Sequence, residues 1–443
     1  MDNHNEIEGV LREWIASQEE APQSLSQMEQ NIRAWLYRVG NVLLSLWLMC
    51  IIPSYDAPSV ACPHCRGQAK YQRRREGTLR TMLGQVKYKR AYYLCGACGR
   101  GHYPVDDQYG LRPNAMSAEV ERLAALMGVQ MPFAQASVIF SELTLTSLSD
   151  QSIDKASQSY GQTVEKVETD LYQQAVEEDT EVKPRQGHLR LYGSVDGGRV
   201  RTRAPKGQTQ PWRELKIGAW FQARGEPPKT PDGEWTIQAH DITYYSDILP
   251  SDQFGNLLWA TGIERGAEQA SELIFLGDGA RWIWDLVDFH FPHAIQIVDW
   301  FHACEYLAPV AKSAFKNKTQ QDDWIHTLRD QLWHGNLDEV ITTCQDFVQP
   351  HLKSEDDPAQ RAVTYFTNNQ HRMDYPTYRK HGYHIGSGTI ESGVKQIASQ
   401  RMKVSGARWN LQSARLVAKA RASFLSGQWD YIATQRRCLQ KCA

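Results

Sequence analysis

The sequence lacks the marks of secreted, membrane-spanning and repetitive proteins. It opens with the acids Asp2, Glu6 and Glu8, unlike the basic start of a secretory signal. The apolar stretch 41–52 is shorter than the roughly 20 residues that a membrane span needs, so we expect a buried helix that Pro53 ends. The nine cysteines do not form a secreted disulfide framework, and no internal repeat or low-complexity tract is present. These absences favour a cytoplasmic, reducing location.

The chain also lacks a strong net charge. With 443 residues, 41% of them hydrophobic and 23% charged, and a net charge of -2, it has the composition of an ordinary globular protein of two or three domains. Its basic residues are nevertheless concentrated. Residues 66–100 hold ten Lys or Arg against Glu76 alone, and residues 395–441 hold ten against Asp430 alone. We interpret both blocks as surfaces that contact a polyanion such as nucleic acid; the alternative is a solvated face, which would normally mix signs. The expected contacts are Arg73, Arg74, Arg75, Lys395, Arg401 and Lys403.

Two pairs of cysteines predict a structural zinc site. Cys62 and Cys65 form one CxxC pair, and Cys95 and Cys98 form the other. Each pair offers two thiolates from one tight turn, and two pairs complete a tetrahedral Zn²⁺ site. Residues 86–93 between them alternate as strands do, so we expect a zinc ribbon over 58–106. A redox role is the alternative for a single CxxC pair, and the presence of two pairs argues against it.

Helices are predicted on both sides of this ribbon. Residues 1–57 are expected to form an N-terminal helical segment. Residues 114–180 are predicted to be all helical, with Ser117 capping a helix whose first turn carries acids. The succession of helix, glycine, short helix and serine-capped helix favours a helix-turn-helix-like DNA-binding domain.

The pattern changes to strands from residue 188. We expect the first strand to end at Asp196-Gly197-Gly198, a turn that leads into a second strand over 199–203. Further strands are predicted over 216–221 and 235–245, and a helix over about 251–263.

Two short buried strands then end at Asp278 and Asp299, with a helix between them. This order is that of the ribonuclease-H-like α/β fold, a mixed five-stranded sheet flanked by helices, in which the first and fourth strands are neighbours. We expect its first part over 188–303, an all-helical insertion over 304–380, and its last part with a basic tail over 381–443.

Glu391 is the third acid of interest. Ile390, Val394 and Ile397 recur at helical spacing, with Glu391 and Lys395 one turn apart beside them. Alone, an acid in a first helical turn is explained by the helix dipole. Together with Asp196 and Asp278 it completes three clustered carboxylates, which repel one another unless cations lie among them. Hard oxygen ligands favour two Mg²⁺ or Mn²⁺ ions, the arrangement used for phosphodiester displacement.

These motifs, the strand order and the long helical insertion resemble a DDE transposase of a bacterial insertion sequence, within the Mutator-like group. In that group a Cys or Asp, two spacer residues and a His follow the second catalytic acid, matched here by Asp299 and His302. The resemblance covers about residues 188–425. It implies that Asp196, Asp278 and Glu391 are the catalytic metal-binding triad. It also implies that Asp299 and His302 are structural or DNA-positioning residues near the site; a strand-end cap and a core histidine are the alternatives.

The expected function follows from this resemblance. The chain would bind the terminal inverted repeats of its element, hydrolyse a phosphodiester with two metal ions and join the freed end to target DNA. A homodimer or higher assembly on DNA, associated with the nucleoid, is expected because two ends must be held at once. A structure-specific metal-dependent nuclease on the same fold and a catalytically inactive zinc-ribbon DNA-binding protein are the alternatives.

Overall fold

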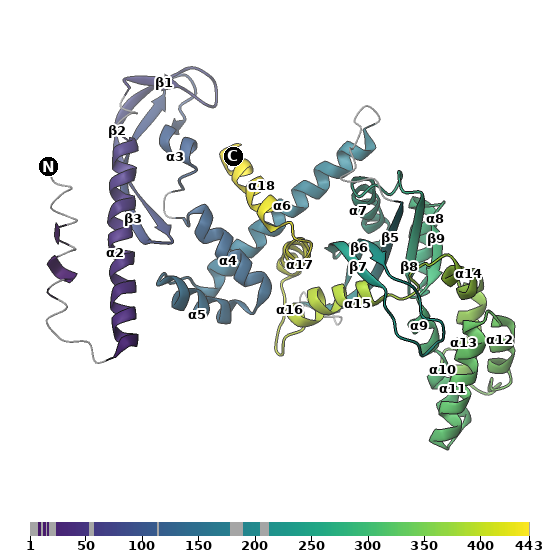
Figure 1. Ribbon diagram of the computed structural model, residues 1–443. Coiled ribbons are helices and arrows are strands. Elements are labelled where there is room, and N and C mark those ends of the chain that lie inside the picture. Colours follow the sequence, from purple (N-terminus) through teal and green to yellow (C-terminus); the bar gives the residue numbers. More distant parts are fainter. Residues whose placement is uncertain are drawn as a thin grey trace. The chain divides into compact units, whose positions relative to one another are not determined.

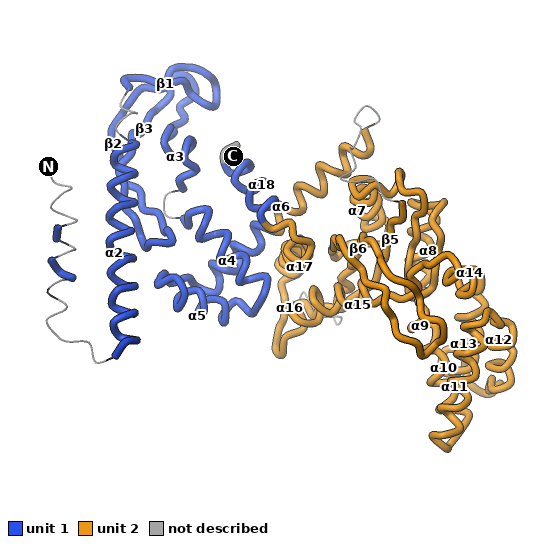
Figure 2. Tube along the Cα trace, in the orientation of Figure 1, with its two compact units in different colours: residues 1–160, 430–443 blue, residues 161–429 orange. Residues whose placement is uncertain are grey.

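The structure is a computed structural model in which two compact units are distinguished (Figures 1 and 2). One unit comprises residues 1–160 with 430–443, and the other comprises residues 161–429. The residues that the structure describes are 8–9, 12–14, 16, 24–52, 57–112, 115–177, 189–203 and 212–442.

Helix α2 (Leu25–Ile51) is the long helix of the first unit. The Ser24 side chain accepts a hydrogen bond from the Gln27 N–H and caps its start. The prediction that residues 41–52 are buried is wrong, since only Leu48 and Ile52 of this stretch are buried. The reason is that one side alone of the helix packs against other elements.

The predicted length of this apolar helix is also corrected. The helix continues N-terminally to Leu25 and is long and apolar enough, by length and composition, to cross a membrane. A lone helix of this kind near the N-terminus is weak evidence for a span.

An antiparallel four-stranded sheet packs against α2. Leu79, Val86 and Tyr88 from this sheet form a buried cluster with Leu48 and Ile52 of the helix. The strands follow one another in the order of the chain: β1 (Ser59–Ala61), β2 (Gln68–Thr81), β3 (Gly84–Cys95) and β4 (Gly101–His102). The short helix α3 (Pro104–Tyr109) comes next, and its Asp106 Oδ2 lies 2.6 Å from Arg90 Nε on β3.

Three helices follow, as predicted for residues 114–180. They are α4 (Ala118–Gln130), α5 (Phe133–Thr144) and α6 (Asp150–Val176). The Ser117 Oγ accepts a hydrogen bond from the Val120 N–H at 3.3 Å, so its predicted capping of α4 is confirmed. Helices α4 and α6 pack closely, because a Cβ at Gly128 would lie 2.1 Å from the Ser157 Oγ. Helix α18 (Trp429–Cys442) contacts α4 through Arg436 Nη2 and Glu121 Oε1, 2.9 Å apart.

The second unit is built on a mixed five-stranded sheet. Its spatial order is β7-β6-β5-β8-β9, with β5, β6 and β7 antiparallel and with β8 and β9 parallel to β5. The first and fourth strands are therefore neighbours, as expected. The strands are β5 (Arg190–Arg201), β6 (Trp212–Arg224), β7 (Gln238–Asp247), β8 (Glu272–Gly277) and β9 (Ile295–Val298).

The hairpin predicted at Asp196-Gly197-Gly198 is wrong. Strand β5 runs without interruption through all three residues and pairs with β6 along its length. Neither glycine has a positive φ. Close packing explains Gly198 instead, because a Cβ there would lie 2.8 Å from the Ala398 Cβ. Asp-Gly-Gly is a turn signal in sequence, but here Gly198 lets a helix approach the sheet.

Helices cover both faces of this sheet (Figure 1). On one face, α7 (Ser251–Glu264) contacts β6, where Trp220 Nε1 donates to Thr261 Oγ1 at 3.2 Å. Helix α8 (Arg281–His290) packs against α7. On the other face lie α15 (Gly388–Val394), the π-helical turn Lys395–Ser399 and α16 (Gln400–Met402).

The helix α17 (Leu411–Leu425) packs beside β7 and is held there by buried charges. The Lys419 Nζ lies 2.8 Å from the Asp247 Oδ2 at the end of β7 and also pairs with Glu168 of α6. The Lys419 and Asp247 side chains are almost completely buried. Breaking such a pair by removing one partner costs about 3–5 kcal/mol, so this contact fixes α17 to the sheet edge.

Residues 300–380 are helical, as predicted. Trp300, Trp333 and Tyr375 form a buried aromatic cluster within them, with Trp300 4.9 Å from Trp333 and 5.1 Å from Tyr375 between ring centroids. The helices are α9 (Trp300–Glu305), α10 (Leu307–Ala314), α11 (Lys318–Trp333), α12 (Leu337–Gln345), α13 (Pro358–Asn369) and α14 (Tyr375–Lys380).

Candidate functional site

Four cysteine sulfurs converge where the first sheet brings two turns together. The Sγ atoms of Cys62, Cys65, Cys95 and Cys98 all lie within 4.8 Å of one another. Cys62 and Cys98 are 3.7 Å apart, and Cys65 and Cys95 are 3.5 Å apart. Zinc–sulfur bonds of about 2.3 Å in a tetrahedron require sulfur separations of about 3.8 Å. The four side chains therefore fit a structural zinc ion.

The register of the parallel strands β5, β8 and β9 aligns three aspartates: Asp196 within β5, and Asp278 and Asp299 directly after the ends of β8 and β9. Ser194 pairs with Leu276, so two residues further along Asp196 stands beside Asp278. Gly277 pairs with Val298, so Asp278 stands beside Asp299. Neighbouring strands are about 4.8 Å apart, and residues two apart share a face. The register thus places Asp196 and Asp278 on the face that carries α15, since Gly198 contacts Ala398 there.

Glu391 reaches this face from the first turn of α15. Tyr244 of β7 holds the helix in place, because its hydroxyl donates to the Thr389 carbonyl at 3.1 Å. Gly393 lets the two come together, since a Cβ there would lie 2.6 Å from the Tyr244 ring. The Glu391 side chain is exposed, and its Oε1 accepts a hydrogen bond of 2.5 Å from the Ser387 hydroxyl. The carboxylate is therefore oriented by one hydrogen bond and is open to solvent.

The electrostatics of Asp196 link the three predicted acids. Burial raises the pKa of Asp196 above its ordinary value, and the negative charges of Asp278 and Glu391 raise it further. A hydrogen bond from the Gly197 N–H and the nearby His302 act in the opposite direction. A cation among these carboxylates would remove the mutual repulsion, so the donor set suits Mg²⁺ or Mn²⁺.

The three carboxylates are less tightly gathered than the cysteines. Among the residues that the structure describes, only the cysteine group has all its ligand atoms within 4.8 Å of one another. Asp196 accepts the N–H of Gly197, the next residue of β5, at 2.6 Å, and Asp278 accepts the N–H of Ala280 at 2.8 Å.

Asp299 is completely buried and connects two elements of this site. One carboxylate oxygen accepts the His302 N–H and caps α9, and the other accepts the Ser387 N–H at the entrance of α15. Burial raises the pKa of Asp299 to about 6, and these two N–H groups offset part of that effect. Of the roles considered for Asp299 from the sequence, this geometry matches that of a strand-end cap. It also connects Asp299 to the helix that carries Glu391.

His302 lies half-buried at the start of α9. Its Nδ1 is 3.5 Å from the exposed Glu305 carboxylate, and its ring contacts Tyr306 and Tyr365. It is close enough to Asp196 to lower the pKa of that group. The histidine is thus neither a fully buried core residue nor part of the aspartate row.

Two residues at the site were not predicted from the sequence. Ser387 connects Asp299 to Glu391 through its N–H and its hydroxyl. The Tyr365 hydroxyl donates to the Asp278 carbonyl at 2.9 Å, and its ring packs where a Cβ on Gly279 would clash. Gly279 also has a φ of +92°. Ser387 could have been found from the sequence, because it directly precedes the predicted helix. No local pattern indicates Tyr365, which lies 87 residues beyond Asp278.

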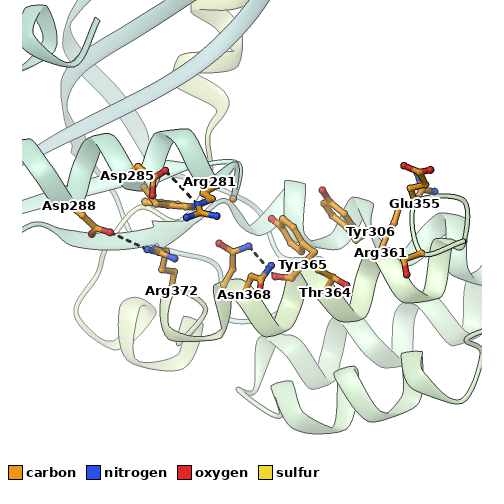
Figure 3. A pocket seen from close by; sticks show the side chains of 14 residues that line it. Arg281, Asp285, Asp288, Tyr306, Glu355, Arg361, Thr364, Tyr365, Asn368 and Arg372 are labelled. Atoms are coloured by element: carbon orange, nitrogen blue, oxygen red, sulfur yellow. Dashed lines mark hydrogen bonds and ion pairs between the residues drawn. The ribbon is translucent and has the colours of Figure 1, made fainter. Parts of the chain in front are cut away.

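A cavity of about 680 Å³ opens beside Asp278, between α8 and α13 (Figure 3). Tyr306 and Tyr365 stack within it at 3.7 Å between ring centroids, and Asn368 lies beside them. Its charged lining residues are three arginines and three acids. They are Arg281, Arg361, Arg372, Asp285, Asp288 and Glu355.

The six basic residues predicted to contact DNA differ in exposure. Arg73 and Arg74 are exposed on β2, whereas the Arg75 guanidinium lies 3.9 Å above the Tyr92 ring. Lys395 and Lys403 are exposed.

The prediction that Arg401 contacts DNA at the surface is not supported by its position. Arg401 is buried, and its guanidinium lies 4.9 Å from the Trp409 ring centroid, so it supports the chain after the π-helical turn instead of presenting charge to DNA.

No protein-family profile matches the chain, and no curated protein matches its sequence.

Proposed function

We propose that this chain is a DNA transposase that cleaves and joins DNA ends with two metal ions. The observation that carries the proposal is the register of β5 and β8, which sets Asp196 beside Asp278 on the face that bears α15 and Glu391. The raised pKa of Asp196 supports it, since the charges of the other two acids contribute to the shift. The strand order and the position of the helical segment agree with a ribonuclease-H-like core, which is the fold that the sequence resemblance implies.

In this proposal Asp196, Asp278 and Glu391 hold two Mg²⁺ or Mn²⁺ ions. Such ions activate an attacking hydroxyl and stabilise the leaving oxygen of a phosphodiester. Asp299 and Ser387 orient Glu391, because their hydrogen bonds join the end of β9 to the start of α15. Exposed Lys395 and Lys403 contact the phosphates that flank the scissile bond.

The first unit would bind the terminal inverted repeats. Arg73 and Arg74 are exposed on the strand that follows the first pair of cysteines, and a zinc ion at those cysteines would keep the strand in place. Phosphate contacts of this kind position a protein on DNA, while base contacts supply the sequence preference.

The test uses purified protein and a duplex carrying the DNA that flanks the gene, where the proposal expects inverted repeats. We expect Mn²⁺-dependent cleavage that frees a 3′-hydroxyl, followed by joining to a target plasmid. Glu391→Gln should reduce cleavage by about 10³-fold or more, because a metal ligand is lost. The matched control Glu268→Gln, at an exposed acid, should cleave normally.

The same assay separates the alternatives. Cleavage without joining would identify a nuclease on this fold, and end binding without cleavage would identify an inactive DNA-binding protein. Cleavage that survives Glu391→Gln at the wild-type rate would refute the assignment of the triad.

A further inference from the structure

Helix α2 has two different long faces. One packs against the sheet, and the other is largely left open by the elements that the structure describes, although the Trp14 ring lies 4.9 Å from the Trp35 ring of the helix. On the packed face, the Asn41 Nδ2 donates to the Leu83 carbonyl at 2.8 Å, and Leu44, Leu48 and Ile52 meet the hairpin of β2 and β3. The opposite face is apolar but largely exposed. Leu25 is 71% exposed, and Trp47 is 69% exposed.

The exposed face forms one continuous stripe along the helix. Successive residues of the stripe, from Leu25 to Cys50, lie 3, 4, 4, 3, 4, 4 and 3 positions apart in the sequence, so the pattern repeats every 11 residues. This repeat of 3.67 residues per turn keeps the stripe on one side of a nearly straight helix. All members are exposed except the half-buried Val39. The stripe consists of Leu25, Met28, Ile32, Leu36, Val39, Leu43, Trp47 and Cys50.

The stripe is suited to packing against the same stripe on a second copy of the chain. Its span of 25 residues corresponds to about 38 Å of helix, and no Asp, Glu, Lys or Arg occurs between residues 39 and 52 to oppose pairing. Among the described residues, the other exposed large apolar side chains are distributed over several elements and form no comparable row. A second copy therefore offers a matching surface that the rest of the described chain does not.

We propose that α2 pairs with α2 of a second copy along this stripe and makes the protein a homodimer. Two identical helices with an 11-residue repeat form a self-complementary interface about a two-fold axis. The dimer itself does not depend on the proposed function. If that function holds, pairing would hold two end-binding units together, which the joining of two DNA ends requires.

The test measures the mass of the full-length, zinc-loaded protein by size-exclusion chromatography with light scattering, without DNA or Mg²⁺. We expect a dimer for the wild-type chain. The variant Leu36→Glu with Leu43→Glu should raise the dissociation constant by at least about 100-fold, because it buries charge in an apolar interface. Both side chains are about half exposed, so the fold of one copy should persist. Asn31→Glu with Ala34→Glu places the same charges off the stripe and should remain dimeric.

Three outcomes would overturn the proposal. They are a monomeric wild-type chain, a dimer that the Leu36 and Leu43 substitutions do not weaken, and stripe-dependent flotation of monomers with phosphatidylglycerol vesicles. The variant Leu25→Glu with Trp47→Glu repeats the test near the two ends of the stripe. It gives a second result if the first variant fails to fold. The mass measurement involves no DNA cleavage. A monomeric protein would therefore not contradict the assignment of the acidic metal site, and a failed cleavage assay would not contradict the dimer.

Discussion

The cysteine cluster and the acidic edge of the second sheet gather their ligand atoms in different ways. The four cysteines lie at two turns of one local sheet, and all four sulfurs already lie within 4.8 Å of one another. The acids come from β5, from the end of β8 and from a helix that begins after a long helical segment. Their carboxylates share a face without closing around a point.

Charge explains this difference. Neutral thiols can approach one another before a metal arrives, and backbone turns set their positions. Carboxylates repel one another, and the charges of Asp278 and Glu391 add to the rise in the pKa of Asp196 that burial causes. Each carboxylate accepts a local hydrogen bond instead. The backbone therefore sets the positions of the four thiols, whereas the proposed acidic site would need a cation to draw its side chains together.

Removing one thiolate should have the largest effect. In Cys95→Ser the zinc ion should be lost and β2 and β3 should unfold, because a structural zinc contributes on the order of 10 kcal/mol to small domains. Hydrogen exchange should show lost protection in β2 and β3 and retained protection in β5 and β8. Cys438→Ser, at an exposed cysteine outside the cluster, is the control. Unchanged zinc content and protection in Cys95→Ser would contradict the zinc assignment.

A smaller effect is expected where the acidic site is supported indirectly. Asp299→Asn leaves one N–H donor at His302 or Ser387 without its acceptor, so Glu391 should lose its orientation. Cleavage should slow by about 10–100-fold and require more Mn²⁺, while end binding stays constant. Asp374→Asn changes another N-cap aspartate, which accepts the Thr377 N–H and makes no contact with Ser387 or Glu391 among the hydrogen bonds of the described residues, and it should leave the rate unchanged. An equal loss of end binding would indicate a general folding defect instead.

The smallest effect concerns the contact between β5 and the chain that follows Glu391. Gly198→Ala should destabilise the second unit by about 1–3 kcal/mol, since its Cβ would lie 2.8 Å from the Ala398 Cβ. Thermal unfolding with and without Mn²⁺ would measure this. Gly388→Ala is the control, because no atom lies within 4 Å of its added Cβ. Equal stability of the two variants would show that close packing does not explain Gly198.

The sequence predicted features that depend on local spacing or on strand ends. The cysteine pairs, the helices over 114–180 and 300–380, and the adjacency of the strands that lead to Asp196 and Asp278 all agree with the structure. These follow from periodicity and from chain order, which are readable one segment at a time.

Features that depend on distant packing were missed or wrong. Gly198 resembled a turn because its partner, Ala398, is remote in sequence, and Arg401 was expected at the surface although Trp409 encloses it. Burial of residues 41–52 was overestimated, because composition does not reveal that only one side of α2 is covered. Ser387 was recognisable from the sequence only as a serine before a helix, because its contact to Asp299 joins residues 88 positions apart.

The central claim is that Asp278 binds a catalytic metal ion, and exchanging its ligand atom tests this directly. Mg²⁺ requires hard oxygen ligands, whereas Mn²⁺ accepts a sulfur ligand more readily. We predict that Asp278→Cys cleaves end-containing DNA only with Mn²⁺, while Asp285→Cys, at an exposed acid of α8, cleaves with either ion. Cleavage by Asp278→Cys with Mg²⁺ at the wild-type rate would contradict the claim.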